Sequence, residues 1–312
     1  MASSIDTAVA PGRVTTDARP GPSLTDALLL FTCILWGVNY SVVKYGTTVM
    51  DPLAYNGARV ALAAVAFGGL ALALARGARG VKRPARRDVL GLLLLGVLGN
   101  GVYQWLFAEG VARTRAGSAA LLLASSPALI ALIGRGMGVE RVGRRGYAGV
   151  ALSVSGIALV VYGGARHAEG HSTLAGNLLL LVGALCWALY TVLLKPYTHR
   201  VSLVDISALT LAGGAVPLAL AALPAMAATS WSRLPPLAFG AIVYSGIGSL
   251  VLGYLFWYRG VRVLGPTRTA IFSNLQPVVA LLVSWRLLAE VPTPWQVMGA
   301  LTIIGGVILT RT

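Results

Sequence analysis

Ten apolar segments, each close to the length of a membrane-spanning helix, constrain this chain more than any other feature of its sequence. A helix needs about 20 predominantly apolar residues to cross the hydrocarbon core of a bilayer. The expected spans are residues 25–46, 53–75, 88–111, 116–134, 147–163, 175–195, 203–225, 236–262, 266–287 and 294–310. These segments take up most of the 312 residues. The sequence therefore predicts an all-α membrane protein with ten transmembrane helices and no sizeable soluble domain.

The composition excludes an ordinary soluble protein. Hydrophobic residues make up 56% of the chain and charged residues only 11%, whereas soluble domains contain about 25% charged residues. A formal net charge of +15 would suit a nucleic-acid-binding protein if the cations lay on a folded polar surface. Here they lie between apolar segments. We therefore expect a lipid bilayer around the chain and no nucleic-acid partner.

The same cations predict the orientation of the chain. If the N-terminus is cytoplasmic and ten helices alternate, 18 of the 25 Lys and Arg residues fall on the cytoplasmic side and six on the other. Arg59 is the one cation that lies well inside a span, away from its ends. Positive charge favours the cytoplasmic side of a membrane. We expect a multi-pass protein of the cell (inner) membrane with both termini in the cytoplasm, beginning with a disordered tail over residues 1–24.

The second half of the sequence repeats a pattern of the first half. The matched positions, at a shift of 150, are Pro127, Glu140, Gly149 and Gly156, then Pro277, Glu290, Gly299 and Gly306. At a shift of 151, Trp36 and Lys44 match Trp187 and Lys195. The repeats are expected over residues 25–163 and 175–311, with five helices each. Because five is odd, the second repeat enters the membrane from the opposite side, an arrangement typical of transporters.

These positions also carry a resemblance to a known family. The first span contains Leu35-Trp36-Gly37-Val38-Asn39-Tyr40 followed by Lys44, and the second span contains Pro52 and Arg59. Together with the duplicated Pro-Glu-Gly-Gly pattern, they resemble the EamA family of the drug/metabolite transporter superfamily. The resemblance covers nearly the whole chain after residue 24. It implies a ten-helix carrier of metabolites, typically an exporter of amino acids or related small solutes.

The second repeat departs from the first at two places. Ala188-Leu189-Tyr190 replaces Gly37-Val38-Asn39, and Leu209 or Thr210 replaces Arg59. We therefore expect the two halves of the substrate cavity to be chemically unequal.

A carrier needs polar and aromatic side chains that face an internal cavity, because lipid cannot satisfy them. The expected cavity residues are Trp36, Asn39, Tyr103, Gln104, Ser126, Trp187, Tyr190, Tyr254, Trp257, Asn274 and Gln276. Aromatic rings and amides suit a small zwitterion or a planar metabolite. The alternative for the tryptophans is plain helix packing. The small residues Ala241, Ser245, Ser249 and Gly253 recur at every fourth position and predict a surface for close helix packing.

Two prolines and one arginine are further candidates. Pro127 and Pro277 lie within spans and are expected to kink them, either to serve a rocking motion or to shape a static packing. Arg59 is expected to pair with Glu109. The alternative role for Arg59 is to bind a substrate carboxylate.

The sequence carries no phosphate-binding loop, dinucleotide-binding glycine motif or zinc-protease motif. We expect no enzyme, no catalytic residue, no metal and no cofactor. The small-molecule partner is expected to be an exported amino acid or related metabolite. A multidrug or hydrophobic-solute exporter is the first alternative, and a channel-like or enzymatic membrane protein is the second. Substrate, direction, coupling ion and oligomeric state are not fixed by the sequence.

Overall fold

The computed structural model describes residues 23–77, 84–138, 144–166 and 173–311, and all regular structure within these ranges is helical. Nearly all of the tail expected over residues 1–24 lies outside them, as does Glu140. In the first half the helices are α1 (Leu24–Val49), α2 (Pro52–Gly77), α3 (Arg86–Gly96), η1 (Val97–Val102), α4 (Tyr103–Ala112), α5 (Ala116–Leu123), α6 (Ser126–Gly136) and α7 (Arg144–Arg166). In the second half they are α8 (Leu174–Thr198), α9 (Leu203–Ala228), η2 (Trp231–Arg233), α10 (Pro236–Val243), η3 (Tyr244–Leu252), α11 (Gly253–Leu264), α12 (Pro266–Phe272), η4 (Ser273–Leu275), α13 (Gln276–Leu288) and α14 (Pro294–Arg311).

Several of these helices continue one another, so the described residues form ten long segments. Eight of them are long and apolar enough to cross a membrane, and Tyr147–Tyr162 within α7 is a shorter apolar helix. Large apolar side chains such as Val65, Leu72 and Leu220 are exposed on the outside, where lipid rather than water suits them. The prediction of an all-α membrane protein is confirmed.

At one end of the bundle, charged side chains connect the termini of neighbouring helices. Arg262 Nε donates to the carbonyl oxygen of Thr198 at 2.5 Å, and its Nη2 donates to that of Val201 at 2.7 Å. Arg200 forms an ion pair with Asp88 at 3.0 Å. The turn between α8 and α9 is thereby held against the end of α11 and the start of α3. Arginines near the ends of helices satisfy backbone carbonyls that have no partner within the helix.

At the opposite end of the bundle, Lys44 and Glu290 likewise connect the ends of neighbouring helices. Lys44 Nζ donates to the carbonyl oxygens of Val111 and Ala112 at 3.2 and 2.9 Å, at the C-terminus of α4. Glu290 Oε1 accepts a hydrogen bond from the backbone N–H of Ala116 at 3.3 Å, at the N-terminus of α5. A cation at a helix C-terminus and an anion at a helix N-terminus both complement the helix dipole. Glu290 thus joins the second repeat to the first.

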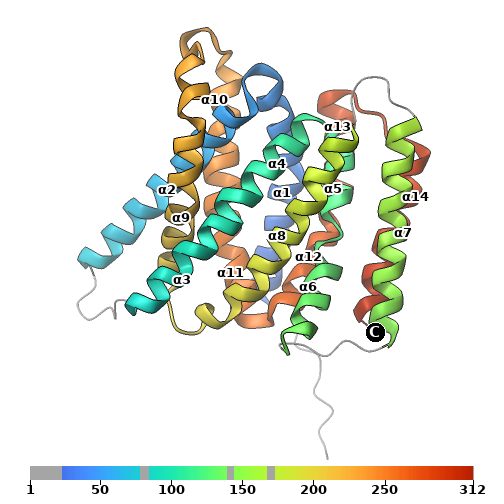
Figure 1. The fold of residues 1–312 in the computed structure, drawn as a ribbon, viewed down its shortest axis with the longest axis horizontal. Helices are drawn as coiled ribbons and strands as arrows, with labels where there is room; N and C mark the ends of the chain where they lie inside the picture. Colours follow the sequence, from blue (N-terminus) through green and yellow to red (C-terminus); the bar gives the residue numbers. More distant parts are fainter. Residues whose placement is uncertain (1–22, 78–83, 139–143, 167–172, 312) are drawn as a thin grey trace, which may run out of the picture.

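The two halves pack in matched pairs (Figure 1). Helix α2 lies against α9, and α7 lies against α14. Helix α1 contacts α11 and α13, while its counterpart α8 contacts α4 and α6. The contacts that α1 makes with the second half therefore have equivalents in those that α8 makes with the first half. This is the arrangement of two inverted five-helix repeats, which confirms the predicted fold class.

The repeated glycines form the contact between α7 and α14, which stand side by side at one edge of the bundle (Figure 1). A Cβ atom on Gly156 would lie 2.9 Å from the carbonyl oxygen of Gly299, and a Cβ on Gly299 would lie 2.9 Å from that of Gly156. Gly306 likewise lies against the carbonyl oxygen of Gly149. Small residues allow helix backbones to approach closely in lipid. The two contacts are equivalent to one another, since each joins the first glycine of one repeat to the second glycine of the other.

This contact predicts unequal effects for two Gly-to-Ala substitutions. Gly156→Ala should destabilise the protein by about 1–3 kcal/mol, because the new methyl group forces α7 and α14 apart. Gly68→Ala in α2 is the matched control, since a Cβ there meets nothing within 4 Å. Thermal unfolding of the purified protein in detergent measures both. Equal unfolding temperatures for the two variants would contradict the prediction.

Candidate functional site

The segments around the centre of the bundle are interrupted at equivalent places in the two repeats. Each third segment of a repeat contains a π-helical stretch, η1 in the first and η3 in the second. Each fourth segment is broken, at Ala124–Ser125 in the first repeat and at η4 in the second. Interruptions of this kind occur frequently at functional sites, because they free backbone groups and redirect side chains.

The two predicted kinks are breaks between separate helices. Pro127 is the second residue of α6, and Pro277 is the second residue of α13. A proline in the first turn of a helix removes no hydrogen bond, because the N–H groups there have no partner within the helix. The prolines therefore begin new helices after an interruption and do not bend continuous ones.

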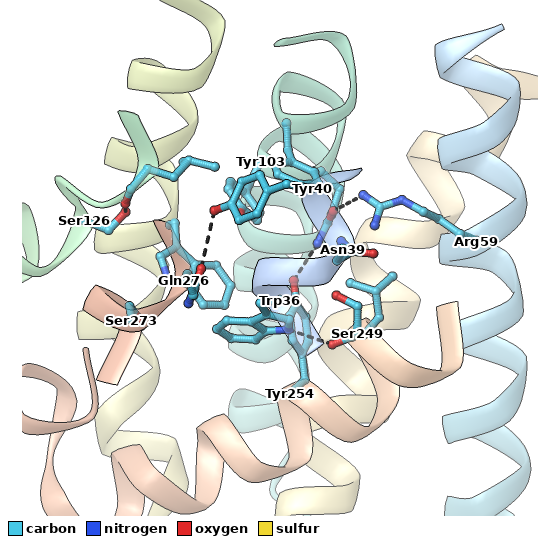
Figure 2. A pocket seen from close by; sticks show the side chains of 15 residues that line it. Trp36, Asn39, Tyr40, Arg59, Tyr103, Ser126, Ser249, Tyr254, Ser273 and Gln276 are labelled. Atoms are coloured by element: carbon cyan, nitrogen blue, oxygen red, sulfur yellow. Dashed lines mark hydrogen bonds between the residues drawn. The ribbon is translucent and has the colours of Figure 1, made fainter. Parts of the chain in front are cut away.

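A small cavity of about 50 Å³ lies among these interrupted segments (Figure 2). Eight of the eleven residues predicted for the cavity line it, namely Trp36, Asn39, Tyr103, Gln104, Ser126, Trp187, Tyr254 and Gln276. The wall also contains Tyr40, Arg59, Phe107, Leu123, Ser249, Leu250 and Ser273. The wall thus combines aromatic rings, amides and hydroxyls with one cation.

Three predicted residues do not line the cavity. The hydroxyl of Tyr190 is directed to that of Tyr258, with which it forms a hydrogen bond. Trp257 is fully buried, with its ring centroid 5.1 Å from that of Trp36, whose ring lies at the cavity wall. Asn274 lies in η4, next to the lining residue Ser273 but not in the wall. For these three, the prediction is wrong because neighbouring side chains occupy the wall.

Arg59 is fully buried and is surrounded by neutral hydrogen-bond acceptors. Its Nε donates to Asn56 Oδ1 at 2.9 Å, its Nη1 to Ser245 Oγ at 3.1 Å and its Nη2 to Gln104 Oε1 at 2.5 Å. The guanidinium also lies 5.5 Å from the ring centroid of Phe107. Figure 2 shows it extending from its helix toward the cavity. Such contacts solvate a cation that bulk water does not reach.

The predicted ion pair between Arg59 and Glu109 is wrong. Glu109 pairs with Arg113, the residue that directly follows α4. Gln104 and Glu109 are five residues apart, so their side chains point about 140° away from each other around the helix. Because Gln104 faces Arg59, Glu109 faces away from it.

Hydrogen bonds across the cavity join the two repeats. Trp36 Nε1 donates to the carbonyl oxygen of Ser249 at 2.9 Å (Figure 2). Gln104 Nε2 donates to the hydroxyl of Tyr254 at 2.6 Å, and these two residues occupy equivalent positions, 150 apart. The cavity therefore lies at the interface between the repeats, where their symmetry axis passes.

Sequence reasoning missed the role of Ser245 and Ser249, which it assigned to helix packing. Ser245 accepts from Arg59 and donates to Asn39 Oδ1 at 2.7 Å. Ser249 lines the cavity. The signal was present, because two hydroxyls one turn apart mark a polar stripe on an apolar segment. Nothing in the sequence distinguishes the lining residues Phe107 and Leu123 from other apolar residues.

The part of the chain that the structure describes contains no group of three or more His, Cys, Asp or Glu side chains suited to a metal ion. Cys33 and Cys186 are free and buried.

Comparison with known proteins assigns the family. The family model described as the EamA-like transporter family matches residues 23–162 and again residues 174–312. The chain belongs to this family. It is thus a multi-pass membrane protein of a family of transporters rather than of enzymes, and its partners are the lipid bilayer and a small-molecule substrate. The resemblance noted in the sequence is confirmed.

Relatives of this EamA-like transporter carry further information. It is 30% identical to a probable terminal-alkyne amino-acid exporter of Streptantibioticus cattleyicolor, over 90% of this chain and 91% of that protein. It is 29% identical to a probable amino-acid metabolite efflux pump of Salmonella typhimurium, over 89% and 92%. It is 28% identical to an uncharacterized transporter of Bacillus subtilis, over 90% and 91%. A crystal structure with 22% identity shares the fold, with a TM-score of 0.65 over 91% of this chain and 96% of that one.

The Arg59 network predicts unequal effects for two substitutions. Gln104→Met removes the acceptor of a buried guanidinium N–H and should cost about 1–3 kcal/mol of stability or more. Tyr254→Phe removes only the acceptor of the neutral Gln104 amide N–H and should cost less. Thermal unfolding in detergent compares them. An equal loss for both would show that the bond from Arg59 to Gln104 contributes little.

Proposed function

We propose that this EamA-like transporter exports amino acids or related small metabolites by alternating access. The observation that carries the proposal is a polar and aromatic cavity that lies between two inverted repeats and is bridged by hydrogen bonds from both. Inverted repeats supply two equivalent packings, and a site at their interface is reached from either side in turn.

The size of the cavity supports this mechanism. A volume of about 50 Å³ admits only a few water molecules. An amino acid is larger, so it binds only when the walls separate. Separation breaks bonds across the interface, such as that between Trp36 and Ser249. The interrupted helices beside the cavity allow this movement without unwinding intact turns.

The substrate class and direction are supported by the relatives, two of which are named as an amino-acid exporter and an amino-acid metabolite efflux pump. The wall suits such solutes, because amides and hydroxyls such as Asn39 and Ser126 bind polar groups while the rings of Trp36 and Trp187 cover an apolar side chain.

Counterflow in proteoliposomes tests the proposal with a panel of labelled amino acids, nucleosides and cationic dyes. We expect saturable exchange of at least one amino acid. Trp36→Ala should reduce it about tenfold or more, because a truncated wall loses contacts worth at least ~1.4 kcal/mol. Gly68→Ala, which lies away from the cavity, is the working control. Exchange of dyes alone would favour a multidrug exporter, and no exchange of any amino acid would refute the amino-acid proposal.

We further propose that both termini are cytoplasmic, since the basic residues favour that orientation. Labelling of single cysteines with a membrane-impermeant maleimide in intact cells tests it. Ser232→Cys, in the connection between α9 and α10, should be labelled, whereas His199→Cys, in the turn between α8 and α9, should not. Both positions are exposed. The native Cys33 and Cys186 are buried and give little background. The reverse pattern would invert the orientation.

A further inference from the structure

We propose that Arg59 binds a carboxylate of the transported solute and thereby sets the charge that the carrier accepts. This inference rests on the proposed function, and it names the group that recognises the substrate. The solutes it implies are anions and zwitterions with one carboxylate. Organic cations are excluded from the site.

The first support is the absence of a counter-ion. Arg59 is fully buried and lines the cavity. Among the described residues no Asp or Glu lies within ion-pair distance of it, and its three hydrogen-bond partners Asn56, Gln104 and Ser245 are all neutral. A buried cation without a counter-ion is costly within a membrane protein. A bound carboxylate would supply the missing negative charge.

The second support is the number of free donors. A guanidinium has five N–H groups, arranged in a fork that matches a carboxylate. The bonds to Asn56, Ser245 and Gln104 use three of them. Two N–H groups remain without an acceptor among the described residues. One belongs to each terminal nitrogen, so both are available to the carboxylate of a solute.

The third support is the inequality of the two repeats. Gly246 lies against the backbone carbonyl of Arg59, and Gly96 lies against that of Thr210 in the same way. Thr210 therefore occupies the place of Arg59 in the second repeat. The charge is present on one side of the symmetry axis only. One carboxylate is bound, and the remainder of the solute contacts the rings of Trp36 and Trp187, which line the same cavity and touch one another.

The positive charge of Arg59 also distinguishes the proposed carrier from a multidrug carrier that accepts cations. At low local dielectric a cationic solute in the same cavity is repelled by the guanidinium. Within the described part of the chain, no carboxylate lines the cavity to offset this repulsion. Cationic dyes should therefore compete poorly.

Competition in counterflow tests the proposal on the unmodified protein, with phenylalanine as the labelled probe. Unlabelled phenylalanine and 3-phenylpropionate should compete, whereas phenylalaninamide and phenethylamine, which lack the carboxylate, should compete about tenfold less or worse. Equal competition by the amide would overturn the proposal. If phenylalanine is not exchanged, the exchanged amino acid and its amide replace it.

Variants of Arg59 give the second readout. Arg59→Gln should abolish the preference for the acid over the amide, and Arg59→Lys should keep it at weaker affinity, because lysine retains the charge but not the fork. Arg135→Gln, an exposed position outside the cavity, is the control that removes the same charge and should behave as the wild type. An unchanged KM and an unchanged preference in Arg59→Gln would overturn the proposal.

Thermal stabilisation by millimolar 3-phenylpropionate tests the carboxylate site at Arg59 separately from export, because it needs no transport. Stabilisation of the wild type and of Arg135→Gln, but not of Arg59→Gln, supports the carboxylate site even if export fails. Amino-acid exchange without any preference for the acid supports export and refutes the site. Should Arg59→Gln not fold, the comparison of acid with amide on the wild type decides.

Discussion

The buried guanidinium of Arg59 must be solvated by side chains, because neither lipid nor bulk water reaches it. Its partners come from both repeats. Asn56 and Gln104 belong to the first and Ser245 to the second, and Ser245 in turn binds Asn39 on α1. One charge therefore fixes the mutual position of α1, α2, α4 and η3. The cavity exists where these segments meet, and its chemistry follows from the same residue.

Around Arg59 the bundle has two kinds of segment. The helices α7 and α14 at one edge are continuous and closely packed, whereas several segments at the cavity are interrupted (Figure 1). Helices α7 and α14 are held by glycines such as Gly156 and Gly299, whose backbones approach too closely for any side chain between them. By contrast, four of the segments at the cavity, the third and fourth of each repeat, contain π-helical turns or breaks. A carrier needs both properties, since one part has to hold the repeats together while the other changes its packing.

The fold could be predicted from the sequence, whereas the residues of the site could be predicted only in part. Hydropathy and the repeat around Pro127 and Pro277 indicated the segments and their inversion. Eight of the predicted cavity residues reach the wall, but their role in binding stays a prediction. The partner of Arg59 was predicted wrongly, because Gln104 and Glu109 lie on the same helix and a segment that is apolar on nearly all faces carries no stripe to show which of them points inward.

The sequence by itself determined how many segments there are, that they form two related halves, and that one cation lies among them. These properties depend on residue type and spacing along the chain. Only the tertiary structure decided that Arg59 is solvated by Gln104 and Ser245, and that Trp257 lies behind the wall instead of in it. Those outcomes depend on how far each helix is rotated about its axis. In an apolar surrounding, that rotation is set by contacts with other helices.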